Sequence, residues 1–137
     1  CDIAGESGIT VASENLLTPD EFKLLSSMVG RDNFKVYYDS QNYFLFKGYD
    51  QVEILRRLHD LMVPQLHVKD GNGVMSGSLL GKGNSNFYGT IETLKEIGYE
   101  GYILLENYYD QLPLRLENES PYELLRQDVA ILKKAVE

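Results

Sequence analysis

Cysteine and long apolar runs are scarce in this chain. A single cysteine, Cys1, excludes a disulfide within the chain and fits a reducing compartment such as the cytoplasm. No apolar run approaches the roughly 20 residues that a membrane-spanning helix requires. The opening residues also lack the basic, apolar and small-residue pattern of a signal peptide. We therefore expect a soluble, cytoplasmic protein with no membrane partner.

Basic residues are also few. The chain has 13 Lys and Arg against 21 Asp and Glu, which gives a formal net charge of −8 at pH 7. A protein that binds nucleic acid or an anionic membrane needs a basic face, so this balance argues against both partners. The expected partners are small molecules or cations.

The length and apolar content set the scale of the fold. With 137 residues, 43% of them hydrophobic, the chain suffices for a single domain over residues 1–137 with its own core. Its first residues, CDIAGESG, are typical of the last turn of a helix that Gly8 closes. A beginning inside a secondary-structure element is what a truncated or proteolysed protein would show.

Four short apolar runs recur along the chain and give its strongest signal. Each has the length and composition of a buried strand, and each precedes a segment with helical spacing: ITVASE, FKVYYD, QLHVKD and GYILLE. This β-α-β-α-β-α-β-α order predicts an α/β fold built as a parallel (βα)4 unit.

Local signals place the helices and loops between these runs. Capping boxes at Thr18 and Glu21 and at Ser120 and Glu123 predict a helix over residues 19–29 and a last amphipathic helix. Further helices are expected to end near Met62 and to cover residues 88–97. The remaining expectations are an aromatic loop at 42–50, a break into the third strand at Pro64, and a functional Gly- and Ser-rich loop at 71–86. Inward positions on the first two helices are predicted at Phe22, Leu24, Leu25, Met28, Val52, Ile54, Leu55 and Leu58.

A potential metal ligand closes each of the four runs: Glu14, Asp39, His67 and Glu106. The carboxyl ends of parallel strands share one edge of a sheet, so these side chains are expected to converge. Three carboxylates and one neutral imidazole form a hard donor set that suits an open site for a divalent cation. Mn²⁺ is the first choice, with Mg²⁺, Co²⁺ and Zn²⁺ as alternatives.

Each of these residues alone has a plainer interpretation. An Asp or Glu at the end of a strand more often caps a helix or sits in a solvated turn. His67 could be a hydrogen-bonded core residue, although its alternation with Leu66 and Val68 turns it away from the outer helices. Four such residues in order favour the metal site over four separate coincidences.

The order of elements and the residues at the strand ends resemble the xylose isomerase-like TIM barrel family, which includes sugar phosphate isomerases and epimerases and AP endonuclease family 2. The resemblance covers the second half of that barrel, strands five to eight, through the motifs SEN, YYDSQN, LHVKD and ILLEN. The segment LGKGNSNF is similar to the family's L-G-E-G-x-x-x-F loop. It departs from that pattern at Lys82, where Glu is usual, and at Asn84 and Asn86, where acids are common.

The resemblance implies half of a TIM (β/α)8 barrel and a metal-dependent sugar or sugar phosphate isomerase or epimerase. It assigns Glu14 and Glu106 as metal ligands that also act as acid and base on a ketose, through an enediolate. Substrate contacts are expected from Asn42, Lys69 and Asp70. For Lys69 and Asp70 a role as plain loop polarity stays open, and for Tyr43, Phe44 and Phe46 stacking on a sugar and packing at the rim are both open.

Two other classes of function stay open. The chain could be a truncated, non-catalytic half-barrel or scaffold that needs the missing first half. An AP endonuclease-like barrel is less favoured, because that chemistry gathers several zinc ions with more histidines than the two in this acidic chain. Half a barrel would also have open strand edges at ITVASE and GYILLE, which predicts a homo-oligomer formed through exposed sheet edges.

Overall fold

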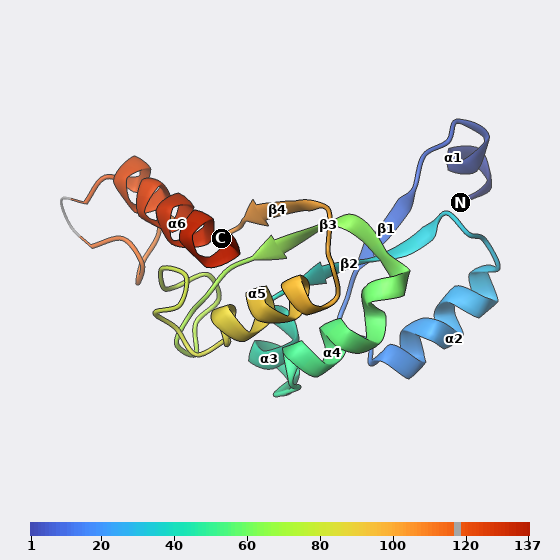
Figure 1. Cartoon of the computed structure of the whole chain (residues 1–137), viewed down its shortest axis with the longest axis horizontal. Helices are drawn as coiled ribbons and strands as arrows, with labels where there is room; N and C mark the ends of the chain where they lie inside the picture. Colours follow the sequence, from blue (N-terminus) through green and yellow to red (C-terminus); the bar gives the residue numbers. More distant parts are fainter. Residues whose placement is uncertain (117–118) are drawn as a thin grey trace.

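The sheet of this computed structural model has four parallel strands in the order β1-β2-β3-β4 (Figure 1). The structure describes residues 1–116 and 119–137. The strands are β1 (Val11–Glu14), β2 (Phe34–Asp39), β3 (Met62–Val68) and β4 (Tyr102–Leu105). Strands that are neighbours in the sheet are also consecutive in the chain, and all three pairs are parallel. The predicted parallel (βα)4 unit is confirmed.

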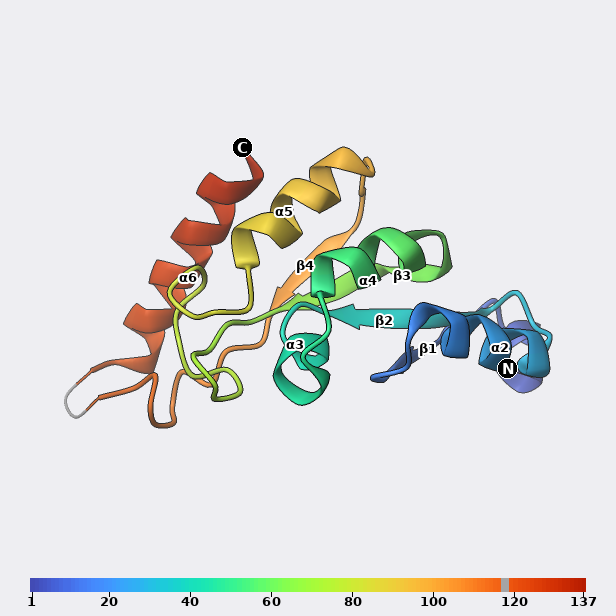
Figure 2. The ribbon, with the colours of Figure 1, turned by 90° about the horizontal axis from the view of Figure 1, so that it is seen from below.

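Helices occupy the connections between strands. They are α1 (Asp2–Glu6), α2 (Pro19–Val29), α3 (Asn42–Lys47), α4 (Gln51–Leu58), the short 3-10 helix η1 (His59–Leu61), α5 (Phe87–Glu96) and α6 (Pro121–Val136). Figures 1 and 2 show α2, α4 and α5 along one face of the sheet, with α6 beyond β4. Within residues 1–116 and 119–137, no helix covers the opposite face. Tyr102 points from that face and is 77% exposed.

The core lies between the sheet and the helices on its covered face. It is built around large buried side chains that include Phe22, Tyr38, Leu55, Leu66 and Phe87. Burial of each such side chain stabilises the fold by about 1.5–3 kcal/mol relative to exposure. The four inward positions predicted on α4 are all buried: Val52, Ile54, Leu55 and Leu58. None of the helices in the described residues is long and apolar enough to cross a membrane.

The prediction for α2 was right in its bounds and wrong in its apolar face. Thr18 and Glu21 form the capping box, and Gly30 closes the helix with a φ of 59°. Phe22 is fully buried, but Leu24 and Met28 are exposed. The reason is position, because α2 is the outermost of the helices along the sheet and has α4 on one flank only (Figure 2).

The second capping box was predicted wrongly. Helix α6 begins after Ser120, but within the described residues the Ser120 side chain makes no capping hydrogen bond. The Glu123 carboxylate instead lies 3.4 Å from the Arg126 guanidinium. The helix still begins at Pro121, whose fixed φ favours the first helical position.

Two further segments differ from the sequence prediction. The aromatic segment after Asp39 is helix α3, closed by Gly48 at a φ of 65°, and not a loop. Strand β3 begins at Met62, so Pro64 lies within the strand. The β2-β3 register is irregular there: Val36 pairs with Met62, but Tyr38 pairs with Leu66. Proline has no N–H to donate to the ladder, which accounts for the extra residues on β3.

Candidate metal centre

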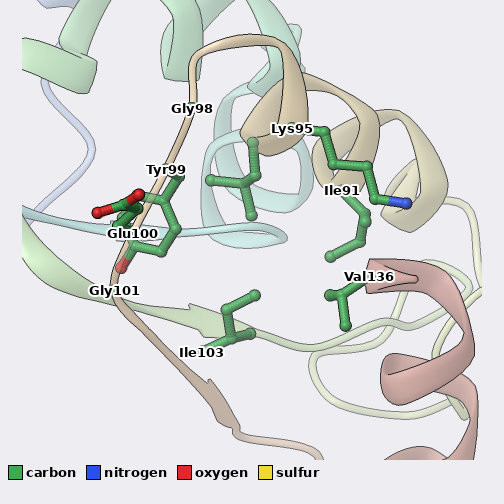
Figure 3. A pocket seen from close by; sticks show the side chains of 9 residues that line it. Ile91, Lys95, Gly98, Tyr99, Glu100, Gly101, Ile103 and Val136 are labelled. Atoms are coloured by element: carbon green, nitrogen blue, oxygen red, sulfur yellow. The ribbon is translucent and has the colours of Figure 1, made fainter.

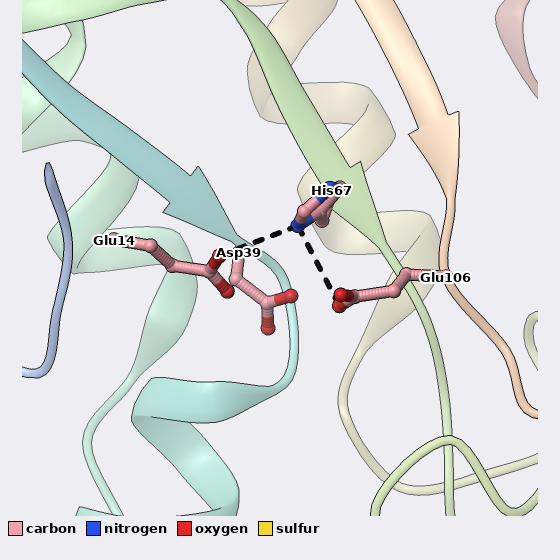
Figure 4. A group of neighbouring side chains, drawn as sticks. All are labelled: Glu14, Asp39, His67 and Glu106. Atoms are coloured by element: carbon pink, nitrogen blue, oxygen red, sulfur yellow. Dashed lines mark ion pairs between the residues drawn. The ribbon is translucent and has the colours of Figure 1, made fainter. Parts of the chain in front are cut away.

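The four predicted ligands converge at one edge of the sheet (Figure 4). Each of Glu14, Asp39, His67 and Glu106 offers one ligand atom, and these atoms all lie within 4.8 Å of one another. Glu14, Asp39 and His67 lie in the last two residues of β1, β2 and β3, and Glu106 directly follows β4. The parallel register thus assembles the group from residues spread over most of the chain.

His67 stands between the two glutamates. Its Nδ1 lies 3.6 Å from Glu14 Oε2 and 3.5 Å from Glu106 Oε2, as the dashed lines in Figure 4 mark. The ring packs against Tyr37, with the ring centroids 4.7 Å apart. Nδ1 is buried and has no hydrogen-bond partner among the described residues, so this nitrogen faces the carboxylates with a free coordination position.

Asp39 is the most buried of the ligands, at 1% exposure. Its Oδ1 accepts hydrogen bonds from the backbone N–H groups of Gln41 (2.8 Å) and Asn42 (2.7 Å). Its Oδ2 lies 3.1 Å from Lys69 Nζ as an ion pair and has no hydrogen-bond partner in the part of the chain that the structure describes. Burial raises the pKa of Asp39 above its ordinary value, although Lys69 and the two N–H groups oppose that rise.

These residues fit a divalent cation. Two buried atoms of the group, Asp39 Oδ2 and His67 Nδ1, lack hydrogen-bond partners, and such groups are rarely left unpaired in proteins. The two glutamates bring further oxygens to the same point. Three oxygen donors and one nitrogen, with no thiolate, suit Mn²⁺ or Mg²⁺ better than a structural zinc site.

Two of the three predicted substrate contacts lie at this centre. The Lys69 ammonium contacts Asp39 Oδ2 at 3.1 Å and Glu106 Oε2 at 2.6 Å. Burial alone would lower the pKa of Lys69, but these two carboxylates outweigh it and raise the pKa above its ordinary value. Asn42 donates from Nδ2 to Glu14 Oε1 at 3.0 Å, while its Oδ1 is buried and has no partner.

The third predicted contact, Asp70, does not reach the centre. Its carboxylate accepts hydrogen bonds from the N–H groups of Gly71, Gly81, Gly83 and Ser85 and from the Ser85 hydroxyl. Both oxygens are therefore occupied by the Gly-rich loop. In this structure the Asp70 carboxylate holds the loop in place.

Comparison with known proteins identifies the family. The sequence profile described as xylose isomerase-like TIM barrel matches residues 1–135. The chain belongs to this family. Over 117 residues it is 29% identical to an uncharacterized protein of Methanocaldococcus jannaschii, a match that covers 77% of this chain and 39% of the relative.

Solved structures show the same fold. An L-ribulose 3-epimerase superposes with a TM-score of 0.78 at 19% identity, over 98% of this chain and 50% of that one. The 3-keto-D-glucoside 4-epimerase of E. coli gives a TM-score of 0.75 at 19% identity, over 97% of this chain and 49% of that one. The chain thus spans half or less of the length of these relatives, and its (βα)4 unit is half of a TIM barrel.

Several residues that position this half-barrel's centre were not predicted from the sequence. The Gln41 side chain accepts from Ser76 N at 2.8 Å and donates to Val74 O at 3.0 Å. The Ser76 hydroxyl in turn donates to the Glu106 carbonyl at 2.8 Å. The loop after β3 is thereby joined both to the segment that follows Asp39 and to the backbone of Glu106.

A second unpredicted group lies behind Glu106. Asp128 of α6 is fully buried and accepts from Leu80 N (2.8 Å), Asn107 Nδ2 (2.7 Å) and the Tyr109 hydroxyl (2.8 Å). Asn107 Oδ1 also accepts from Asp70 N at 3.0 Å. One signal could have revealed Asp128: it follows the buried Leu124 by four residues, which puts an acid on the apolar face of α6.

The aromatic residues after Asp39 divide between core and rim. Tyr43 is buried and stacks on Tyr38, with the ring centroids 5.9 Å apart. Phe46 is exposed and lines a hollow of about 240 Å³ together with Glu14, Leu16 and Asn42. Of these aromatics, Phe46 therefore lies where it can reach a ligand held beside Glu14.

A larger hollow of about 500 Å³ lies away from the centre (Figure 3). Its lining includes Ile91 and Lys95 of α5, Tyr99 in the turn before β4, Ile103 and Val136. It borders the beginning of β4, whereas the four ligands gather at the strands' carboxyl ends. It therefore contributes nothing to the candidate metal centre.

Proposed function

We propose that this chain supplies the metal-binding half of a sugar or sugar phosphate isomerase or epimerase. Glu14, Asp39, His67 and Glu106 would hold the divalent cation, Mn²⁺ in the first place. When bound there, it would supply Lewis acidity toward a ketose carbonyl, which favours loss of the proton on the neighbouring carbon through an enediolate. The convergence of these four residues within 4.8 Å is the observation that carries the proposal.

The exposed fractions of the four ligand side chains differ, and this divides the ligands that can only hold a cation from those that can also reach a substrate. Asp39 and His67 have side chains only 1% and 20% exposed, so they can hold a cation but hardly reach a substrate. The Glu14 and Glu106 side chains are 37% and 35% exposed. They come from the two outer strands of the sheet and face each other across His67 (Figure 4). Epimerisation needs a base on one face of the sugar carbon and an acid on the other, which these two glutamates would provide.

Substrate recognition is proposed for the side chains around Glu14. Asn42 holds Glu14 with its Nδ2 and also lines the adjoining hollow, where its amide would meet a sugar hydroxyl. Phe46 and Leu16 would provide an apolar wall for the carbon chain in the adjoining hollow. Lys69 donates to Glu106 Oε2 and forms an ion pair with Asp39 Oδ2, and a remaining N–H would contact a substrate oxygen held at the cation.

An open four-stranded sheet favours completion by a second half-barrel. Among residues 1–116 and 119–137, β1 and β4 each have one unpaired edge, and Tyr102 and Leu104 lie exposed on the uncovered face. The relatives are about twice as long as the matched part, so four further βα units would close the barrel. We propose that a second copy of this chain or the remainder of a longer protein supplies them. Without these further units, the half-barrel would act as a binding scaffold and not as an enzyme.

The proposal is tested by proton exchange on ketoses in deuterated water. The chain, loaded with Mn²⁺, is incubated with L-ribulose and with 3-keto-glucosides, and deuterium at the carbon beside the carbonyl is followed by NMR. We expect incorporation that is lost in Glu14→Gln and Glu106→Gln and kept in the exposed control Glu92→Gln. Normal incorporation by both ligand variants would contradict the assignment. Absence of incorporation by a chain that binds Mn²⁺ would favour the scaffold.

A further inference from the structure

A positively charged side chain, that of Lys69, lies against the proposed cation site. It follows His67 by two residues, so its side chain leaves the strand on the same side as the imidazole. The side chain is only 3% exposed, and its ammonium contacts Asp39 Oδ2 and Glu106 Oε2, oxygens of two of the four ligands. A positive charge is thus buried beside the point where a cation would bind.

The backbone of Lys69 is held firmly. The fully buried Ser40 hydroxyl accepts from Lys69 N at 3.1 Å and donates to Lys69 O at 3.1 Å. Ser40 directly follows Asp39, so one hydroxyl joins the ends of β2 and β3. These contacts hold the ammonium beside the ligand oxygens.

The formal charges of the four ligands and Lys69 can be added to give the net charge of the group. Glu14, Asp39 and Glu106 carry three negative charges, His67 is neutral as a ligand, and Lys69 carries one positive charge. The group therefore has a net charge of two negative units, which a divalent cation neutralises. A trivalent cation would leave an excess positive charge beside a buried ammonium, and uncompensated buried charge is costly.

We propose that Lys69 is a built-in counter-charge that matches the centre to divalent cations and disfavours trivalent ones. This inference rests on the proposed metal centre and adds a determinant of its selectivity. Repulsion between the ammonium and a bound cation grows in proportion to the charge of the cation. Removal of the ammonium should therefore favour a trivalent ion more than a divalent one.

The test compares Tb³⁺ with Mn²⁺ by titration of the whole chain. Tb³⁺ bound here is detectable by sensitised emission, since the Tyr37 ring lies 4.7 Å from that of His67. In Lys69→Gln, the ratio of Tb³⁺ to Mn²⁺ affinity should rise about tenfold or more over the wild-type ratio. Lys69→Arg keeps the charge and should keep the wild-type ratio. The control Lys82→Gln removes an exposed lysine of the loop and should change nothing.

A second variant separates the charge of the group from the loss of the Lys69 side chain itself. The double variant Lys69→Gln, Glu106→Gln restores two negative charges and should return the affinity ratio to near the wild-type value, with both affinities reduced. An unchanged ratio in Lys69→Gln, while His67→Ala loses both ions, would overturn the role of Lys69 and leave the metal centre standing. Undiminished binding of both ions by His67→Ala would instead remove the metal centre and this inference with it.

Discussion

Asp39 and His67 are direct partners across the β2-β3 ladder, and each presents a buried atom without a hydrogen-bond partner toward the same point. Their neighbours on the outer strands, Glu14 and Glu106, complete the group within 4.8 Å. Because the pairing of β2 with β3 sets this geometry, the centre depends on a register that is regular from Tyr38 onward, past the irregularity at Pro64.

Asp39→Asn should abolish most cation binding while leaving the fold in place. The amide oxygen can still accept from the N–H groups of Gln41 and Asn42, but the charge that faces Lys69 is lost. Saturating Mn²⁺ should raise the melting temperature of the wild type, because a cation bound to the folded state stabilises it, and should barely raise that of the variant. Differential scanning fluorimetry measures both. The control Asp20→Asn removes an exposed partner of Arg57 and should keep the wild-type shift.

Asp128 should matter for stability far more than its distance from the ligands suggests. Asp128→Ala leaves two buried donors, on Leu80 and Asn107, and the part-buried Tyr109 hydroxyl without their acceptor, and should cost about 3–5 kcal/mol of unfolding free energy. Tyr109→Phe removes one of these bonds and should cost about 1 kcal/mol. Urea unfolding gives both values. A cost below that of Tyr109→Phe for the alanine variant would contradict the network.

The same carboxylate should make stability depend on pH. Burial raises the pKa of Asp128 above its ordinary value, although the hydrogen bonds from Asn107, Leu80 and Tyr109 oppose that rise. The folded state thus holds this proton more tightly than the unfolded state. Its contribution is present below pH 3.8 and is lost as pH rises through the raised pKa. Relative to Asp128→Asn, the wild type should lose unfolding free energy across that window, and a constant difference would contradict the shift.

The two helix caps offer a matched pair. Thr18→Ala removes a side chain that accepts from Glu21 N and should cost about 1 kcal/mol. Ser120→Ala, at the same position of α6, removes a hydroxyl that makes no capping bond and should cost only a few tenths of a kcal/mol. Chemical unfolding of the two variants side by side compares them. Equal losses would show that Ser120 caps its helix in solution.

These caps also show how far the sequence could predict the fold. The bounds of α2 followed from Thr18, Glu21 and Gly30, because all three act within the helix's own ends. The same motif at Ser120 gave the right start for a partly wrong reason, since Glu123 turned toward Arg126. Exposure of Leu24 and Met28 could not be foreseen, because it depends on which elements lie beside α2.

The centre was more predictable than its surroundings. Each ligand ends an apolar run, so the parallel order alone brings the four together. Asp70 shows where prediction from the sequence ends. Its position beside Lys69 suggests a place in the metal centre, but its carboxylate accepts hydrogen bonds from residues up to 15 positions later. Hydrogen bonds of that range, like those of Asp128 to Leu80 and Tyr109, arise only once the chain is folded.

Closure of the barrel by a second copy predicts self-association. Leu104→Lys places a charge on the open face of β4. The introduced ammonium would lose its hydration in the closed barrel, so the variant should weaken the dimer of the isolated chain about tenfold or more. Tyr88→Lys, on an exposed position of α5, is the control and should leave association unchanged. Sedimentation velocity over a range of concentrations resolves the two. A wild-type chain that stays monomeric at high concentration would contradict closure by a second copy.

The most direct measurement is calorimetric titration of Mn²⁺ into the chain and into the double variant Glu14→Gln, Glu106→Gln. The double variant Glu92→Gln, Glu100→Gln makes the same change of charge at exposed positions away from the centre. We predict saturable binding of about one ion per wild-type chain, as expected for a single assembled site, with binding lost in the first variant and retained in the second. Absence of binding by the wild type, or equal binding by all three proteins, would contradict the metal centre.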